Sequence, residues 1–265
     1  MADSLLKTLR NVSPDEAEAV VGLAALTGKI SRTAELSRLA PAYAATAAGL
    51  PIPVMEAGAS FFAFSALGVC GDSTTRLERK LDDQITRYIA EDQQLQVSTS
   101  IKARPLSMQA PCTNGHAALK IQPTINLLKM QRAFASSDSR TLESLLAAVS
   151  NGARTQRPGD IALDFTYQIA WLRLASGDTA EAIRQLDRAL GSLPSMSAPS
   201  LREPASAGSV GRSMALRAEI AAARGDVEDR QRWAAALVEL WGTADAPLQP
   251  LVARMRLLAR PDYRR

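Results

Sequence analysis

The stretch that comes nearest to a nucleotide-binding motif is GLAALTGKIS, residues 22–31. A phosphate loop needs four residues between its glycines and a Ser or Thr after the Lys, because backbone amides must surround the phosphates and the hydroxyl must reach magnesium. Here five residues separate Gly22 from Gly28, and Ile30 follows Lys29. The segment also ends an apolar helical pattern and does not follow a strand. The sequence therefore argues against nucleotide binding.

Cysteine and histidine are too scarce for the usual metal or nucleophile chemistry. The chain has two cysteines, Cys70 and Cys112, and one histidine, His116. Together they offer three nitrogen or sulfur ligands, fewer than the four of a structural zinc site. A nucleophile pair of Cys112 and His116 would need a third group to orient the imidazole, and none is evident. We expect no metal, no cofactor and no catalytic residue, and we keep an enzyme with an unrecognised site, dependent on Cys112 or His116, as an alternative.

The cysteines and the apolar runs also bear on location. We expect buried free thiols and keep a disulfide between Cys70 and Cys112 as the alternative, which requires an oxidising compartment that the sequence does not establish. The opening MADSLLKTLR is followed by acidic and polar residues where a secretory signal has its apolar core. The most apolar run, residues 57–70, is 14 residues long, short of the roughly 18 to 20 needed to cross a bilayer. We predict no transmembrane segment and a cytoplasmic location by default, with an extracytoplasmic or membrane-peripheral one left open.

Charged residues are interspersed along the chain. The 31 basic and 27 acidic residues give a formal net charge of +4, which describes a soluble surface and no nucleic-acid partner. The one local excess lies near the C-terminus, at Arg254, Arg256, Arg260, Arg264 and Arg265. A solvated terminal helix explains it, and an anionic partner or membrane headgroups are the alternative.

The elements that position these residues are predicted to be helices. Aromatic residues are only 5% of the chain and hydrophobic residues 46%, a balance that favours helix packing over sheets. The stretch AWLRLASGDTAEAIRQLDRALGSLP, residues 170–194, has the pattern of a helical hairpin. Gly177 can take the left-handed conformation that ends one helix, and Asp178 can cap the next. Ile183, Leu186 and Leu190 follow at helical spacing.

The hairpin recurs along the chain. Three turns share this Gly-Asp chemistry, at Gly71-Asp72, Gly177-Asp178 and Gly225-Asp226, and two weaker copies turn at Gly28-Lys29 and Ser137-Asp138. A last helix over residues 247–260 has the apolar face of a terminal cap, and Trp233 and Trp241 fall on a core stripe. Residues 95–122 contain two prolines and a Thr-Asn-Gly turn signal but no helical stripe, so they are predicted to be an irregular crossing segment. The Gly-, Pro- and Ser-rich stretches 151–160 and 195–213 are predicted to be loops between repeats.

Residues 167–194 resemble the tetratricopeptide repeat (TPR). The matching positions are Ala170 at the small position of the first helix, Gly177-Asp178 at the turn, Ala182, Ile183, Leu186, Ala189 and Leu190 on the second helix, and Pro194 at the end. The departures are a longer period, Arg173 where an aromatic is common, and Arg230 where the third copy should have a small residue. The phrases RPGDIALDFTYQIAWLRLASGDTAEAIRQLD and ADAPLQPLVARMRLLA are also similar to the non-catalytic C-terminal repeat regions of certain bacterial serine/threonine kinases and related regulators. The kinase motifs themselves are absent from this sequence.

The resemblance implies an all-α, right-handed superhelix of about five antiparallel helix pairs and a capping helix. Its parts would be helical repeats over residues 1–94, the irregular segment over 95–122 and TPR-like repeats over 123–265, joined in one solenoid. The implied function is a non-enzymatic scaffold or structural subunit that binds a partner protein, and the alternative is an accessory stabilising subunit of a membrane-associated assembly. The predicted partner-binding residues are Gln168, Trp171, Arg173 and Arg217 on first helices, and Arg254 and Arg256 on the last helix.

Overall fold

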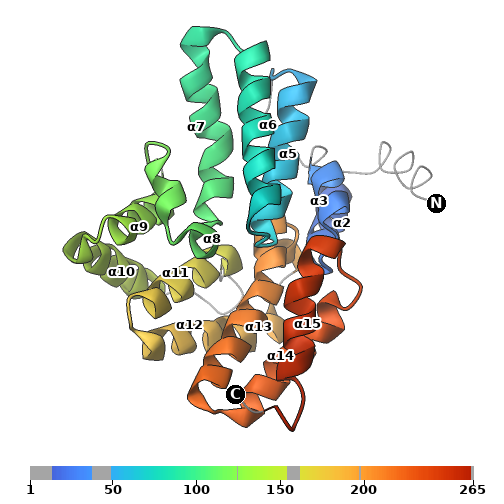
Figure 1. Ribbon diagram of the computed structural model, residues 1–265, viewed down its shortest axis with the longest axis vertical. Coiled ribbons are helices and arrows are strands. Elements are labelled where there is room, and N and C mark those ends of the chain that lie inside the picture. The colour runs from blue at the N-terminus through green and yellow to red at the C-terminus, as the bar shows by residue number, and fades with distance from the viewer. Residues whose placement is uncertain (1–13, 38–48, 124, 154–161, 197, 264–265) are drawn as a thin grey trace.

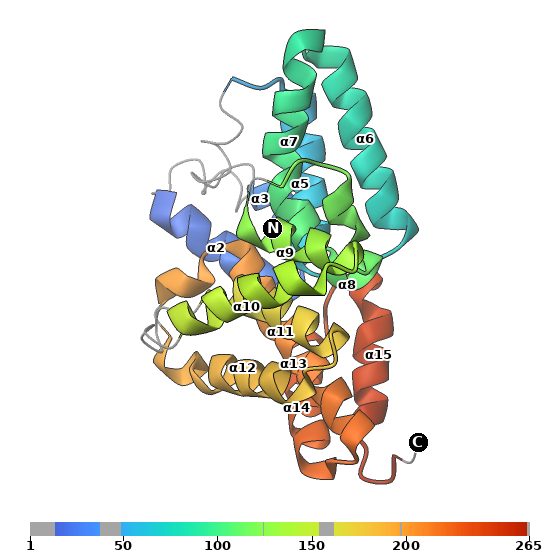
Figure 2. The same cartoon turned by 90° about the vertical axis from the view of Figure 1, so that its left-hand side faces the viewer.

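A computed structural model describes residues 14–37, 49–123, 125–153, 162–196 and 198–263 (Figures 1 and 2). Every regular element in these ranges is a helix, which confirms the all-α prediction. The α-helices are α2 (Pro14–Leu26), α3 (Ile30–Ser37), α5 (Ile52–Ala66), α6 (Asp72–Tyr88), α7 (Glu91–Ser107), α8 (Ala110–Thr113), α9 (Asn126–Ala135), α10 (Ser139–Ala153), α11 (Leu163–Ala175), α12 (Thr179–Gly191), α13 (Pro204–Arg224), α14 (Val227–Trp241) and α15 (Gln249–Leu258). Short 3-10 helices are η1 (His116–Leu119), η3 (Leu193–Ser195), η4 (Ala198–Leu201) and η5 (Ala246–Leu248).

All five predicted turns separate consecutive helices. One residue of each turn has a positive φ, namely Gly28, Gly71, Ser137, Gly177 and Gly225. Three of the turns end in an Asp whose carboxylate accepts a backbone N–H of the next helix: Asp138 from Thr141, Asp178 from Glu181 and Asp226 from Asp229. These bonds satisfy amides that have no partner within the helix, so the turn chemistry alone was sufficient to locate the hairpins.

The C-terminal helix pairs are stacked in chain order. α9 pairs with α10, α11 with α12 and α13 with α14, while the first helices α9, α11 and α13 lie side by side (Figure 1). Each pair buries its apolar stripes against the next one. Leu186 of α12 packs with Leu216 and Ile220 of α13, and Leu237 of α14 packs with Val252 of α15. α15 packs on the α13–α14 pair. Trp233 and Trp241 are buried, as expected.

The N-terminal helices do not continue this stack; they pack on α13. α13 contacts α2 and α5, which come from the other end of the chain. Small residues allow the close approach: an added Cβ would lie 2.7 Å from the carbonyl oxygen of Ala66 at Gly208, and 2.4 Å from the Trp241 ring at Gly211. A solenoid in which each repeat meets only its neighbours contains no such contacts, so one continuous superhelix is not confirmed.

The beginning of α13 also corrects a sequence prediction. We expected residues 195–213 to be a loop because Gly, Ser and Pro are frequent there, but the helix begins at Pro204 and its first half is almost completely buried. Proline is well suited to the first turn of a helix, where its missing N–H has no partner to lose. Two of the small residues that looked like loop composition make close packing possible: Gly208 lets the end of α5 approach the α13 backbone, and Gly211 makes room for the Trp241 ring of α14.

Hydrogen bonds tie the α2–α3 turn to the end of α14. The indole Nε1 of Trp241 donates to the carbonyl of Leu26 at 2.8 Å. The backbone N–H of Asp245 donates to the Gly28 carbonyl at 3.0 Å, and its carboxylate accepts the N–H of Ser31 at 2.9 Å. The region formed by α2, α5, α13 and the end of α14 is hereafter the junction. It joins segments more than half the chain apart.

Residues 95–122 are mostly helical, contrary to the prediction. α7 runs from Glu91 to Ser107 with Pro105 inside its last turn, and only its second half is buried. The first half projects beside α5 and α6, away from the stack (Figures 1 and 2), so its sequence has no continuous apolar stripe. The predicted Thr-Asn-Gly turn is present, with Asn114 and Gly115 both at positive φ. Of the described helices, none combines the length and the apolar character needed to span a bilayer.

Candidate interaction face

Equivalent positions in the three C-terminal pairs can be counted back from the positive-φ turn residue. Three positions before it stand Phe134, Leu174 and Ala222; six positions before it, on α11 and α13, stand Trp171 and Glu219. Because α9, α11 and α13 lie side by side, equivalent residues face the same side of the stack. All five are half-buried, and they are hereafter the inner face.

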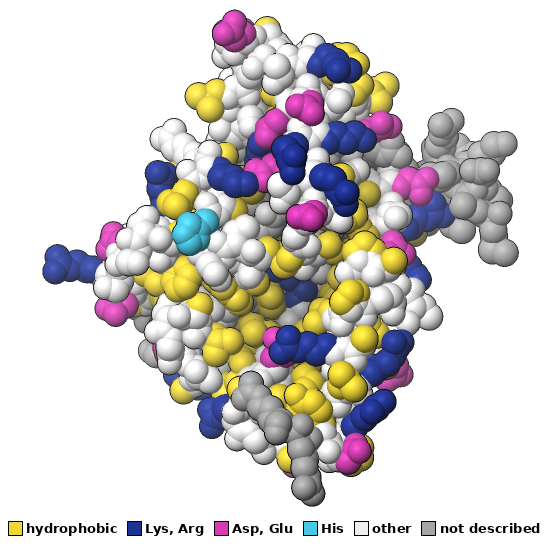
Figure 3. Space-filling view, viewed as in Figure 1, with side chains coloured by type: hydrophobic (Ala, Val, Ile, Leu, Met, Phe, Trp, Pro, Cys, Tyr) yellow, Lys and Arg dark blue, Asp and Glu magenta, His cyan; other side chains and the backbone are white. Residues whose placement is uncertain are grey.

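The inner face is a recessed, largely apolar part of the surface. α11 and α13 lie deeper than α8 and α15, as the two ribbon views together show (Figures 1 and 2). The space-filling view has hydrophobic side chains gathered over these two helices, between α9 on one side and α15 on the other (Figure 3). Partly exposed apolar side chains on rigid, adjacent helices are typical of a surface that binds another protein.

An aromatic pair lies at one end of the inner face. The rings of Phe134 and Trp171 meet edge to face, with centroids 5.6 Å apart and planes at 77°. Such pairs contribute on the order of 0.5–1.5 kcal/mol beyond the burial of their area. Leu174 continues the apolar surface toward α13, where it packs with Ile220. Trp171 was predicted to contact a partner, and it is half-buried within this aromatic pair.

A charged pair lies at the other end. Arg254 of α15 forms an ion pair with Glu219, with Nε 3.2 Å from Oε1 and side chains 64% and 33% exposed. Burial raises the pKa of Glu219, and the Arg254 guanidinium opposes that shift. Arg254, a predicted partner-binding residue, therefore lies beside the inner face. Arg256, the other predicted residue of α15, is exposed and its Nη2 lies 3.4 Å from the Gly242 carbonyl oxygen.

Two predicted surface residues are buried. Gln168 has no exposed area, and its Nε2 donates to the Met108 carbonyl at 3.2 Å. Arg217 donates to Asp187 Oδ1 at 2.7 Å and also pairs with Asp229. The prediction was wrong for both because it assumed that the first helices are uncovered along their length. The segment before α8 lies over Gln168, and the second helices α12 and α14 enclose Arg217.

The two arginines that depart from the TPR pattern hold neighbouring helices together. Arg173 is half-buried; its Nη1 lies 3.3 Å from Asp178 Oδ2, and its Nη2 donates to the Leu146 carbonyl at 3.2 Å. It therefore fastens α11 to α10 and is only partly available to a partner. Arg230 is buried and donates to the carbonyl of Leu258, at the end of α15. A cation at a helix C-terminus is favourable, which explains why this position is not small.

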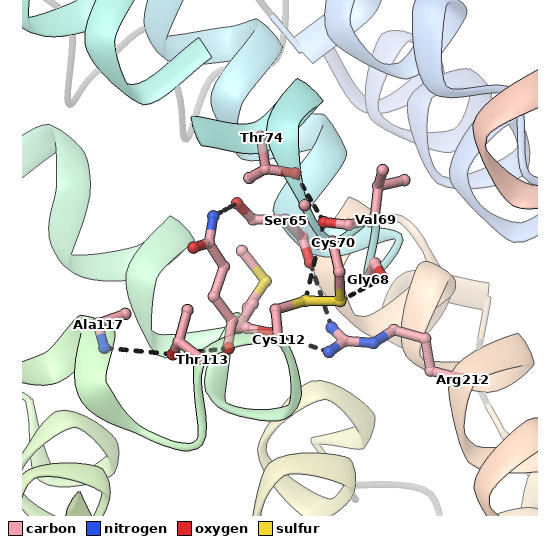
Figure 4. Close-up of a disulfide and its surroundings, with 12 residues drawn as sticks. Ser65, Gly68, Val69, Cys70, Thr74, Cys112, Thr113, Ala117 and Arg212 are labelled. Atoms are coloured by element: carbon pink, nitrogen blue, oxygen red, sulfur yellow. Dashed lines mark hydrogen bonds between the residues drawn. A yellow bond between two sulfur atoms is a disulfide. The ribbon is translucent and has the colours of Figure 1, made fainter. Parts of the chain in front are cut away.

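A disulfide joins the two cysteines beside the junction (Figure 4). Cys70 lies in the turn between α5 and α6 and Cys112 on α8, with Cα atoms 5.2 Å apart. The expectation of free thiols was wrong: residues 42 positions apart are brought together by the return of α7 along α5. No spacing rule could have shown that proximity from the sequence.

A buried arginine connects α13 to the same region. Arg212 donates to the carbonyls of Ser65 at 3.3 Å and Met108 at 2.8 Å, near the ends of α5 and α7 (Figure 4). Its guanidinium also lies over the Tyr167 ring at 4.2 Å from the centroid. The partial negative charge of two helix C-termini and the face of an aromatic ring stabilise the buried cation.

Cys112 and His116, the residues considered for an enzymatic site, do not form a nucleophile pair in the structure. Cys112 is in a disulfide and cannot act as a thiolate nucleophile, which removes the Cys112–His116 pair. His116 is exposed, and its Nδ1 lies 2.9 Å from the Thr113 carbonyl oxygen. Within the described ranges, no group of three or more His, Cys, Asp or Glu side chains is placed to hold a metal ion.

The nearest approach to a carboxylate pair is held by one arginine. Arg104 of α7 lies 2.7 Å from Asp164 and 3.7 Å from Glu203. Burial raises the pKa of Glu203, Arg104 opposes the shift and Asp164 adds to it. Both carboxylates also bond within the structure: Glu203 accepts the Ser206 N–H, and Asp164 accepts the Ser206 hydroxyl. The arrangement fastens the starts of α11 and α13 to α7.

The sequence prediction missed four members of the inner face: Phe134, Leu174, Ala222 and Glu219. Counting back from the turn residues reaches these positions, but the same count on α9 also reaches Gln131, which is buried and donates to the Ser107 carbonyl. The comparisons with known proteins give no further guidance. No protein-family model matches the chain, and neither a curated protein nor a solved structure matches it.

Proposed function

We propose that this protein is a non-enzymatic subunit that binds a partner protein through the inner face. The observation that carries the proposal is the half-buried apolar row of Phe134, Trp171 and Leu174 on adjacent helices that are fastened from behind. A helix or extended segment laid into the recess would bury these side chains together. The TPR resemblance and the stacking of α9 to α15 support a short superhelical stack as the binding unit.

The charged pair suggests how a partner is oriented. Glu219 and Arg254 stand at the α13–α15 end of an otherwise apolar face, so a partner segment with apolar anchors and a polar end fits it in one direction. Buried aromatic anchors usually carry most of the affinity, whereas exposed charges mainly set orientation and association rate. We therefore expect Trp171 to dominate the binding free energy.

A site-specific crosslinking experiment tests the proposal. A photoreactive amino acid is placed at Ala175, exposed on α11 beside the inner face, and separately at Ala180, exposed on α12. A protein crosslinked from position 175 but not from 180 is then purified and titrated onto the chain. Trp171→Ala should weaken saturable binding by on the order of 30-fold or more, as for a typical hot-spot residue. Equal crosslinking from both positions, or binding indifferent to Trp171→Ala, would contradict the proposal.

A second candidate function is an accessory subunit of a membrane-associated assembly that docks through α15. Its exposed side carries Arg254 and Arg256, Arg260 follows just after its end, and Leu257 is 48% exposed between Arg256 and Arg260. Basic residues around an apolar side chain suit an acidic protein surface or anionic headgroups. Co-purification in fixed stoichiometry, lost on Arg256→Glu with Arg260→Glu but kept in Trp171→Ala, would favour this candidate over the inner face.

The disulfide favours an oxidising compartment over the cytoplasmic default. Structural disulfides persist outside the cytosol, where thiol reductants are scarce. Protein taken from its native source under acid quench should resist alkylation at Cys70 and Cys112 until it is reduced. Alkylation of both cysteines before reduction would show that the thiols are free in the native source, and would favour a reducing compartment for the protein.

A further inference from the structure

We propose that the Cys70–Cys112 disulfide controls the inner face. In the oxidised protein, residues 110–119 are held against α9 and support the Phe134–Trp171 pair; a dithiol reductant opens the bridge and releases that support. The use of this response in binding rests on the proposed function, whereas the response itself does not. Three observations carry it: the exposure of the bridge, the dependence of the segment's attachment to the α5–α6 turn on that bridge, and its contact with Phe134.

The bridge is open to a reductant from the Cys70 side. Cys70 is exposed in the turn between Gly68 and Gly71, whereas Cys112 is half-buried. A reductant thiolate attacks Sγ of Cys70, and Cys112 leaves as a thiolate that takes up a proton. The reductant's second thiol then attacks the mixed disulfide, which releases Cys70 as a thiol and closes the reductant's own disulfide. Two electrons and two protons pass from one dithiol to the two cysteines.

Residues 110–119 pack on α9 through η1, but few contacts other than the disulfide hold them to the α5–α6 turn. The chain is firmly held just before them, where Met108 accepts from Arg212 at 2.8 Å and Gln109 donates to Ser65 at 2.9 Å. Beyond that point the buried side chains are alanines, Ala110, Ala117 and Ala118. Alanine buries little apolar area, so each contributes little stabilisation. The covalent bond is therefore the main restraint between this segment and the α5–α6 turn.

The same segment lies directly on the inner-face aromatic pair. Gly115 packs so closely on α9 that an added Cβ would lie 2.9 Å from the Gln131 carbonyl oxygen and 3.2 Å from the Phe134 ring. Phe134 in turn meets Trp171 edge to face at 5.6 Å. Gly115 is only three residues from Cys112, so a shift of α8 after reduction removes one wall of the Phe134 site. The contacts from the bridge to Trp171 are continuous.

Fluorine NMR of the full chain labelled with 5-fluorotryptophan tests the proposal without any partner. The Trp171 resonance is assigned from its loss in Trp171→Phe. Addition of dithiothreitol should shift or broaden this resonance while those of buried Trp233 and Trp241 stay in place, and reoxidation should restore it. Hydrogen exchange of backbone amides over residues 110–119 should become faster by on the order of tenfold, as expected for local opening.

Two variants sharpen the test. Cys70→Ser with Cys112→Ser should have the reduced spectrum and ignore the reductant. Gly115→Ala keeps both cysteines but pushes the segment from α9, so it should move the Trp171 resonance even when oxidised. Quantitative reduction that leaves Trp171 and the exchange rates unchanged would overturn the proposal, as would resistance of the folded protein to the reductant or loss of all three resonances by global unfolding. Because no partner is used, none of these outcomes decides the proposed function.

Discussion

The C-terminal stack and the junction are both built from helical hairpins, but the stack leaves a half-buried surface whereas the junction forms a buried core. In the stack, α9, α11 and α13 are fastened from behind by their second helices and leave the inner face half-buried. At the junction, the first half of α13 is covered by α2 and α5, and glycines bring backbones close together. A helix pair thus becomes a binding surface or a core according to what covers it. The difference depends on tertiary contacts, so the sequence pattern of a hairpin does not predict it.

The junction should be the most sensitive region. Trp241→Ala removes a fully buried side chain that packs on Gly211 and donates to Leu26, so we expect a loss of about 3–5 kcal/mol in the free energy of unfolding. The matched control is Trp171→Ala on the half-buried inner face, which should cost less than about 2 kcal/mol because part of its area is already in water. Urea unfolding measures both. Equal losses would mean that the two regions do not differ as described.

Removal of the disulfide should have the next largest effect. The bridge closes a loop between residues 42 positions apart, and restricting such a loop in the unfolded chain contributes on the order of 2–4 kcal/mol. Cys70→Ala with Cys112→Ala should therefore lower the unfolding temperature while circular dichroism remains helical. Reduced wild-type protein is the control, and it should have the same unfolding temperature as the double variant. A variant as stable as the oxidised protein would show that the bridge does not restrain the chain.

Arg230→Met tests the attachment of the capping helix. It keeps most of the side-chain bulk but removes the guanidinium that donates to the Leu258 carbonyl, at a cost of about 1–3 kcal/mol for the buried acceptor left unsatisfied. Hydrogen exchange should become faster in α15 first and in the junction least. Uniform acceleration over all helices would argue that α15 is integral to the core and not a cap.

The sequence was informative where structure depends on local chemistry. The turns at Gly177-Asp178 and Gly225-Asp226 were predictable because a left-handed glycine and a capping carboxylate act within a few residues. The start of α13 was not, because Gly208 and Gly211 resemble loop residues until the helices that approach them are known. Gln168 was assigned to the surface for the same reason: the segment that covers it belongs to another part of the chain.

The smallest expected effect concerns the inner-face carboxylate and its pH dependence. Burial raises the pKa of Glu219 above its ordinary value of 4.5, so the folded state binds its proton more tightly than the unfolded state does. The stabilisation this gives is complete below the unfolded pKa and is lost as pH rises through the folded pKa. Glu219→Gln, which cannot ionise, should match wild type near about pH 4 and exceed it near about pH 7, by less than about 1 kcal/mol because Arg254 and solvent screen the charge.

Asp138 provides a control of opposite sign at the start of α10, away from the inner face. Hydrogen bonds from the side chain and then the backbone of Thr141 lower the pKa of Asp138, and Arg140 also contributes. Its stabilising contribution is therefore present above the unfolded pKa and lost as pH falls through the folded pKa. Asp138→Asn should be less stable than wild type at neutral pH and approach it in acid. If Glu219→Gln is also less stable than wild type at neutral pH and approaches it in acid, the inner face is not desolvated enough to favour an apolar partner. The contrast between exposed Asp138 and half-buried Glu219 then fails.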